Sequence, residues 1–354
     1  MAFPYIQFLA VQLGEREDRR RARRNLTLVR RNLRDTQDPF SVTDIEFMRC
    51  YRLNKDACQD LIAQVEVVMI NEDVIKKIPP FITVLCALSF FASGSYQRGV
   101  GYSLMNAVSQ ATVSRSIKIV SNIVVRHFMK NCIKFPQTNE ERGQFQEMFY
   151  NATGMPNILG VIDGTHISIV KPHENEHAYM NRKGYHSINV QIVCDQTLKI
   201  IGVVARFPGS THDAFVWRQS ALAHNMKESY EAGDHDSRLI GDSGYPCLPW
   251  LLVPLRSPTT RQEINYSSTI KVAESCVERC IGVLKGKFRC LLRDRTLHYT
   301  PQCASRIIMT CAVLHNITKH YNIPDAVPLW DDIDNEPAQP IDRDEGDVGE
   351  TVLK

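Results

Sequence analysis

The chain has 354 residues, of which 44% are hydrophobic, and its formal net charge is only +3. This composition is typical of a soluble globular protein with a sizeable core, and the length allows two or three domains. No apolar stretch approaches the roughly 20 residues of a membrane span, and the first residues lack the basic segment of a secretory signal. The eleven cysteines form no CxxC pair, which disfavours a zinc site and indicates reduced thiols in an intracellular protein.

Charge is unevenly distributed between the two ends of the chain. Residues 16–34 contain nine arginines, whereas residues 331–350 contain nine acidic residues and one arginine. We expect residues 1–40 to form a basic arm, part of it helical, and residues 323–354 to form a disordered acidic tail. The arginine cluster at residues 19–24 is either a nuclear-import signal or a solvated arm, and intracellular DNA chemistry would favour import.

Residues 41–150 are expected to form an all-helical domain. The signals are a capping-box pattern, a capping asparagine and a proline pair, each followed by a largely apolar run. The expected helices run from Ser41-Val-Thr-Asp44 through Tyr51, from Asn54 toward Val68, and from Pro79-Pro80 through Ala92.

A further helix is expected after Ser109, whose side chain can cap it. Apolar residues follow at helical spacing, and the other face carries polar and basic side chains, namely Gln110, Thr112, Arg115 and Lys118. A helix-turn-helix presents such a face to the major groove of DNA. Because any amphipathic helix has the same pattern, the residues leave open whether this helix reads DNA or packs.

After residue 156 the apolar period changes to two, which predicts strands in residues 151–322. In the second strand, the apolar side chains are expected to face inward, and the alternating Asn189 and Gln191 are expected to face outward. The resulting order is β-β-β-α-β-β-α followed by a last helix. The expected strands are 158–170, 187–195, 198–207, 238–241 and 250–255, and the expected helices are 210–222, 271–288 and 302–320.

Four carboxylates are placed on these elements as a metal-dependent nuclease would require: Asp163, Asp213, Asp242 and Glu278. A carboxylate inside an apolar strand, as at Asp163, costs several kcal/mol to bury unless it is paired, and a divalent cation is a suitable partner. Asp213 is ambiguous, because Ser210-Thr-His-Asp213 also matches a capping box in which the acid only contacts the backbone at a helix start.

The segment Asn181-Arg-Lys-Gly-Tyr-His-Ser187 precedes the second strand and carries three cationic side chains, Arg182, Lys183 and His186. Such a group can contact DNA phosphates, and it is equally typical of a solvated basic turn. Lys285, Lys287 and Arg289 can extend the same surface.

The motifs IDGTHI, NRKGYHS, GSTHDA, GDSGYP and VERCIGVLKGKF, in this order, resemble the nuclease domain of PIF/Harbinger transposases and of the animal nucleases derived from them. The resemblance covers roughly residues 81–320, and SGSYQRGVGYSLMNAVSQATVSRSI looks like the helix-turn-helix of that family. It implies an α/β ribonuclease H-like nuclease domain, a mixed sheet flanked by helices, after an all-α helix-turn-helix domain. The frame Glu-Arg-x-x-x-x-Leu-Lys matches at Glu278, so Glu274 and Asp195 are expected to lie outside the site.

What the resemblance implies is a DNA endonuclease of the DDE superfamily, either a transposase or a domesticated descendant. Its catalytic residues would be Asp163, Asp242 and Glu278, holding two Mg²⁺ or Mn²⁺ ions for phosphodiester hydrolysis or strand transfer, with Asp213 as a further metal ligand. The expected partners are DNA, a Myb-like DNA-binding protein, which the resemblance alone implies, and a second copy of the chain. With the arginine cluster, the expected location is the nucleus and also the cytoplasm. The alternative is a catalytically silent DNA- or protein-binding module, which the presence of all four acids disfavours.

Overall fold

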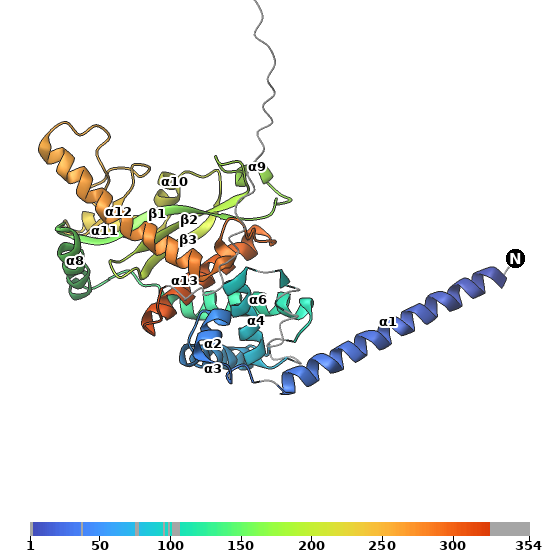
Figure 1. Cartoon of the computed structure of the whole chain (residues 1–354). Helices are drawn as coiled ribbons and strands as arrows, with labels where there is room; N and C mark the ends of the chain where they lie inside the picture. The colour runs from blue at the N-terminus through green and yellow to red at the C-terminus, as the bar shows by residue number, and fades with distance from the viewer. Residues whose placement is uncertain are drawn as a thin grey trace, which may run out of the picture.

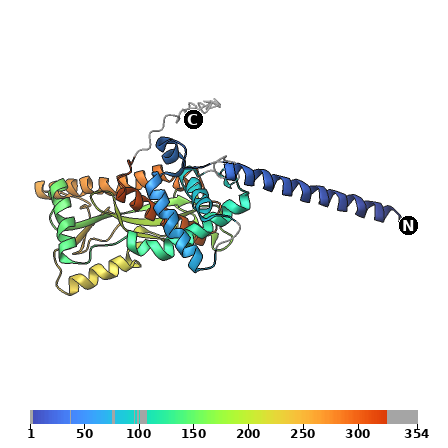
Figure 2. The ribbon, with the colours of Figure 1, turned by 90° about the horizontal axis from the view of Figure 1, so that it is seen from below.

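The computed structural model describes residues 3–36, 38–74, 78–94, 96–97, 100 and 107–325. The first helix, α1 (Phe3–Thr36), projects away from the rest of the molecule in both views (Figures 1 and 2). The arginine-rich stretch is therefore helical over its described length, and nearly all its side chains from residue 17 to residue 33 are exposed. None of the described helices combines the length and apolarity needed to cross a bilayer.

A group of helices follows α1. The two expected caps are confirmed: Asn54 Oδ1 accepts from the Ala57 N–H at 3.0 Å, and Ser109 Oγ accepts from the Thr112 N–H at 3.2 Å. These elements are α2 (Asp44–Tyr51), α3 (Lys55–Asn71), α4 (Pro80–Ser93), α6 (Gln110–Ile123), the π-helical turn η1 (Val124–Phe128), α7 (Met129–Cys132) and α8 (Asn139–Thr153).

The expected capping box at Ser41 was wrong. Helix α2 is capped by Thr43, which forms the box with Glu46. Ser41 instead closes the preceding turn, because its hydroxyl donates to the Asp38 carbonyl oxygen at 2.7 Å. The sequence therefore placed the helix correctly and its cap two residues early.

The second half of the chain contains a five-stranded mixed sheet with the order β3-β2-β1-β4-β5. Strands β1, β2 and β3 form an antiparallel meander, and β4 and β5 continue the sheet parallel to β1. The strands are β1 (Ile158–Ser168), β2 (Ser187–Cys194), β3 (Ile200–Pro208), β4 (Arg238–Gly241) and the short β5 (Leu251–Leu252). This mixed sheet flanked by helices is consistent with the expected ribonuclease H-like fold.

Strand β2 differs from the expectation of one polar face. All eight of its residues are buried, and Asn189 and Gln191 are only 3% and 2% exposed. The reason is that β2 lies inside the sheet with α12 on one face and α10 on the other. Buried amides on such a strand need partners, and Asn189 has one in the site described below.

The helices around the sheet are α9 (Glu176–Tyr179), α10 (Asp213–Arg218), α11 (Ala221–Glu231), α12 (Arg261–Lys287), the 3₁₀ turn η2 (Arg289–Leu291) and α13 (Pro301–His320). The single helix expected at 210–222 is two helices, because Ser220 caps α11 with its own side chain. The long α12 begins ten residues earlier than expected, at a capping box formed by Thr260 and Glu263.

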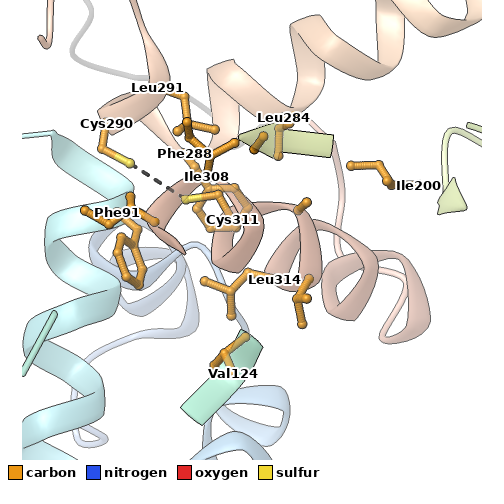
Figure 3. Close-up of a cluster of buried hydrophobic side chains, with 14 of the residues drawn as sticks. Phe91, Val124, Ile200, Leu284, Phe288, Cys290, Leu291, Ile308, Cys311 and Leu314 are labelled. Carbon is orange, nitrogen blue, oxygen red and sulfur yellow. Dashed lines mark hydrogen bonds between the residues drawn. The ribbon is translucent and has the colours of Figure 1, made fainter. Parts of the chain in front are cut away.

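One hydrophobic cluster joins the helical half of the chain to the sheet. Figure 3 shows part of it, where Phe91 of α4 and Val124 of η1 lie near Ile308 and Leu314 of α13. A smaller cluster, which includes Trp217 and Ile162, lies on the α10 and α11 side of the sheet. Because the large cluster is continuous across residue 150, the domain boundary expected there stays a prediction. The eleven cysteines are all free thiols.

Candidate active site

Consecutive side chains of β1 point to opposite faces of the sheet. Asp163 is in register with Ile192, and both belong to the face covered by α12, whereas Ile162 and Gly164 belong to the face covered by α10. The end of β1 is thus the point where side chains from both helical layers can meet.

Asp163 is the most strongly perturbed of the four predicted acids. Its Oδ1 accepts a hydrogen bond from the Gly164 N–H. Burial, and after it the charges of Asp242, Asp213 and Glu278, raise the pKa of Asp163 from 3.8 to about 7 against the lowering effect of that hydrogen bond. All three other predicted acids are therefore near enough to Asp163 to act on its charge.

Asp213 reaches this point from the other face of the sheet. Its carboxylate lies over Gly164, where an added Cβ would stand only 2.7 Å from Asp213 Cγ. Asn189 of β2 donates from Nδ2 to Asp213 Oδ1 at 2.8 Å and so fixes the carboxylate. The capping-box alternative was wrong, because the N-cap of α10 is His212 and it makes no side-chain cap hydrogen bond.

Asp242 follows β4 directly, and its Oδ1 accepts from the Gly244 N–H at 3.1 Å. Burial raises the pKa of Asp242, the Gly244 hydrogen bond lowers it, and the Asp213 charge raises it. Beside it, Tyr245 is 4% exposed and its hydroxyl has no hydrogen-bond partner among the described residues. Burial raises the pKa of Tyr245, followed by the charges of Asp213, Asp163 and Asp242, so this phenol lies among the acids.

Helix α12 contributes two glutamates rather than one. Glu278 is exposed, whereas Glu274, one turn earlier, is partly buried and its Oε1 has no partner among the described residues. Burial, and after it the charges of Asp242, Asp163 and Glu278, raise the pKa of Glu274 to about 7. The expectation that Glu274 lies outside the site was therefore wrong. The spacing of four residues was the available signal, since it places both side chains on one helix face.

We call Asp163, Asp213, Asp242, Glu274 and Glu278 the acid group. It is assembled from β1, α10, the residue after β4, and α12. Within the described part of the chain, no three His, Cys, Asp or Glu side chains stand close enough to hold one metal ion. The acids thus act on one another electrostatically without forming a finished coordination sphere.

Cationic side chains border the acid group. Lys285 of α12 donates from Nζ to Thr165 Oγ1 at 2.8 Å and to the His166 carbonyl oxygen at 3.2 Å, two to three residues beyond Asp163 on β1. Burial, and after it the charge of Lys183, lower the pKa of Lys285 to about 8 against the opposing charge of Asp163. Burial also lowers the pKa of His166, against the opposing charge of Asp213.

The basic turn before β2 divides into two kinds of residue. Arg182 and Lys183 are exposed, and Arg182 Nη2 donates to the His212 ring, at 2.7 Å from Nδ1. His186 is instead partly buried, with its Nε2 at 3.2 Å from Glu176 Oε1 of α9. Arg182 thus contacts His212, the residue before Asp213, whereas His186 contacts the carboxylate of Glu176.

On α6, Gln110, Arg115 and Lys118 are exposed as expected, but Thr112 is only 7% exposed. Its hydroxyl lies 3.0 Å from Ser109 Oγ inside the cap of the helix. The expectation that Thr112 belongs to the exposed face was wrong, because its hydroxyl is part of the helix start. Asp195 behaves as expected for a residue outside the site, since it accepts from the N–H groups of Thr197 and Lys199 in the turn after β2.

Comparison with known proteins assigns the family. Residues 162–316, which include the whole acid group, match the family described as DDE superfamily endonuclease. The protein named "Putative nuclease HARBI1" in Homo sapiens is 36% identical over 250 residues, which are 70% of this chain and 70% of that protein. Its counterpart in Xenopus laevis is 31% identical over the same shares of the two chains. No solved structure matches this chain.

A plant relative, "Protein ALP1-like" of Arabidopsis thaliana, is 25% identical over 66% of this chain and 59% of its own length. The chain belongs to the DDE superfamily endonucleases, in the branch of the Harbinger-derived nucleases.

Proposed function

We propose that the protein is a divalent-metal-dependent DNA endonuclease whose active site is the acid group. The observation that carries the proposal is the convergence of three carboxylates, those of Asp242, Asp213 and Glu278, on Asp163, whose pKa is raised to about 7. Carboxylates crowded in this way repel one another, and a cation placed between them removes the repulsion.

The donor set suits a small, hard cation such as Mg²⁺ or Mn²⁺, which prefers carboxylate oxygens and retains water ligands. Two buried polar atoms, Glu274 Oε1 and the Tyr245 hydroxyl, lack hydrogen-bond partners among the described residues. Buried polar atoms are normally paired, so these two indicate that a polar ligand binds here. Asp163, Asp242 and Glu278 would hold two such ions between them, and Asp213 would be a further ligand from across Gly164. When bound, divalent metal supplies activation of the attacking oxygen and stabilisation of the leaving oxygen.

The protein's own cations would hold the DNA. Lys285 lies beside β1 at the acid group, and Lys183 is near enough to lower its pKa. Arg182 contacts His212, the residue before Asp213, so all three could contact the phosphate under attack and its neighbours. On α6 we keep Gln110, Arg115 and Lys118 as candidate DNA contacts. A Myb-like partner protein, a second copy of the chain and a nuclear location directed by the arginines of α1 complete the proposal.

A plasmid-nicking assay with purified full-length protein tests the proposal. Nicking is expected with Mg²⁺ or Mn²⁺, none in EDTA, and none with Asp163→Asn or Asp242→Asn in either metal. DNA binding without nicking under every metal condition would support the silent binding module instead. Nicking that survives in Asp163→Asn would refute the site.

A further inference from the structure

Two phenylalanines form a surface pair between β3 and α10. The rings of Phe207 and Phe215 pack edge to face, with centroids 6.0 Å apart, and Phe215 is 43% exposed. An arginine guanidinium lies over each ring: Arg206 Cζ is 5.0 Å from the centroid of Phe207, and Arg218 Cζ is 5.8 Å from that of Phe215. We call these four residues the aromatic-arginine patch.

The patch borders an open groove of about 620 Å³ along the free edge of β3. Arg206 and Arg218 line it, together with His224 of α11 and Met309 of α13, and the described lining contains no Asp or Glu. Neither arginine has a carboxylate within 4.0 Å among the described residues, and His224 is paired with Glu228 at 3.1 Å. The groove therefore presents two guanidinium charges that the described part of the chain leaves without counter-charge.

The patch is continuous with the acid group. Phe207 is the cross-strand partner of Asn189, and Asn189 is the residue that fixes the Asp213 carboxylate. Phe215 follows Asp213 by two residues on α10. Arg206 is itself positioned, because its Nη2 donates to the Gln219 carbonyl oxygen at 2.8 Å. The patch therefore adjoins the acid group on the side of Asp213.

We propose that the aromatic-arginine patch and its groove bind single-stranded DNA flanking the phosphodiester at the acid group, with a base on Phe215 and phosphates on Arg206 and Arg218. The inference rests on the proposed function and deepens it by specifying an unpaired strand. An exposed ring can stack on a base only where the base is not already stacked inside a duplex, and guanidinium groups bind phosphate through forked hydrogen bonds. An acidic peptide would use the arginines but would leave the rings without a role.

The test measures binding of a short labelled oligothymidine to the full-length protein in EDTA, by fluorescence anisotropy, so that cleavage does not enter. Phe215→Leu keeps apolar contact with Phe207 but removes the stacking face, and it should weaken binding about tenfold. A strand with an abasic sugar-phosphate backbone should bind the parent protein about tenfold more weakly than oligothymidine, and Phe215→Leu should abolish that difference. Arg206→Gln and Arg218→Gln should each reduce the logarithmic salt slope by about 0.7.

The matched controls are Tyr150→Leu, which removes an aromatic ring that is 57% exposed on α8, and Lys227→Gln, which removes an exposed cation from α11. Both should bind oligothymidine like the parent. Equal binding of oligothymidine and the abasic strand by the parent protein would overturn the proposal. So would tighter binding of a peptide of residues 331–350 than of oligothymidine at the same salt. Stacking-dependent binding in a protein that never nicks DNA would refute the proposed function alone.

Discussion

Replacing Asp163 with asparagine should stabilise the metal-free protein. Burial, with the charges of Asp242, Asp213 and Glu278, raises the pKa of Asp163 from 3.8 to about 7. One pKa unit corresponds to about 1.4 kcal/mol, so ionising this carboxyl costs the folded state about 4 kcal/mol above pH 7. Asparagine keeps an acceptor for the Gly164 N–H and removes the charge, but its amide needs a partner of its own. We therefore expect a net gain of about 2–4 kcal/mol in the free energy of unfolding.

The pH dependence fixes the sign of this effect. A carboxyl whose pKa is raised by folding binds its proton more tightly in the folded state, so the parent protein loses stability as pH rises from about 4 to about 7. The advantage of Asp163→Asn should be full near pH 8 and should shrink as pH falls toward 4. Urea unfolding in EDTA at the two ends of this range measures it, and added Mg²⁺ should favour the parent.

Asp195→Asn is the matched control, because Asp195 is 3% exposed and its carboxylate accepts backbone N–H groups in a turn. It should destabilise the protein by about 1–2 kcal/mol. The reasoning is refuted if Asp163→Asn destabilises the metal-free protein near pH 8 as Asp195→Asn does.

Three further predictions concern the same site. Gly164→Ala should leave the fold intact and displace the Asp213 carboxylate, so that nicking falls about tenfold or more while a thermal melt changes little; activity equal to the parent would contradict the contact. Glu274→Gln should lower the apparent Mg²⁺ affinity in a calorimetric titration and raise the stability of the metal-free protein, whereas unchanged affinity would return Glu274 to a solvated helix face. DNA binding should weaken above about pH 8, where Lys285 loses its charge. Lys285→Met should bind DNA more weakly at neutral pH and should show no further loss of affinity above about pH 8. If the variant still loses affinity above about pH 8, another group is responsible for that loss.

The sequence by itself determined the order of strands and helices along the chain, the positions of most helices, and the four acids first expected in the site. These features are local, because a period of two, a capping asparagine at residue 54 or a Ser109 cap acts over a few neighbouring residues. The motif order also carried the family, which the matches over residues 162–316 and to the human relative confirm.

Only the tertiary structure decided which side chains share the site. Glu274 belongs to the acid group because α12 turns that face toward the sheet, and Asp213 does so because Gly164 leaves space for it on β1. Strand β2 is buried on both faces because helices cover both, which a period of two within one strand does not reveal. The pairing of Asn189 with Phe207 is likewise a long-range register, and it places two surface phenylalanines beside the acids. Such relations depend on how distant segments pack, since each segment's own sequence specifies only its local period and its ends.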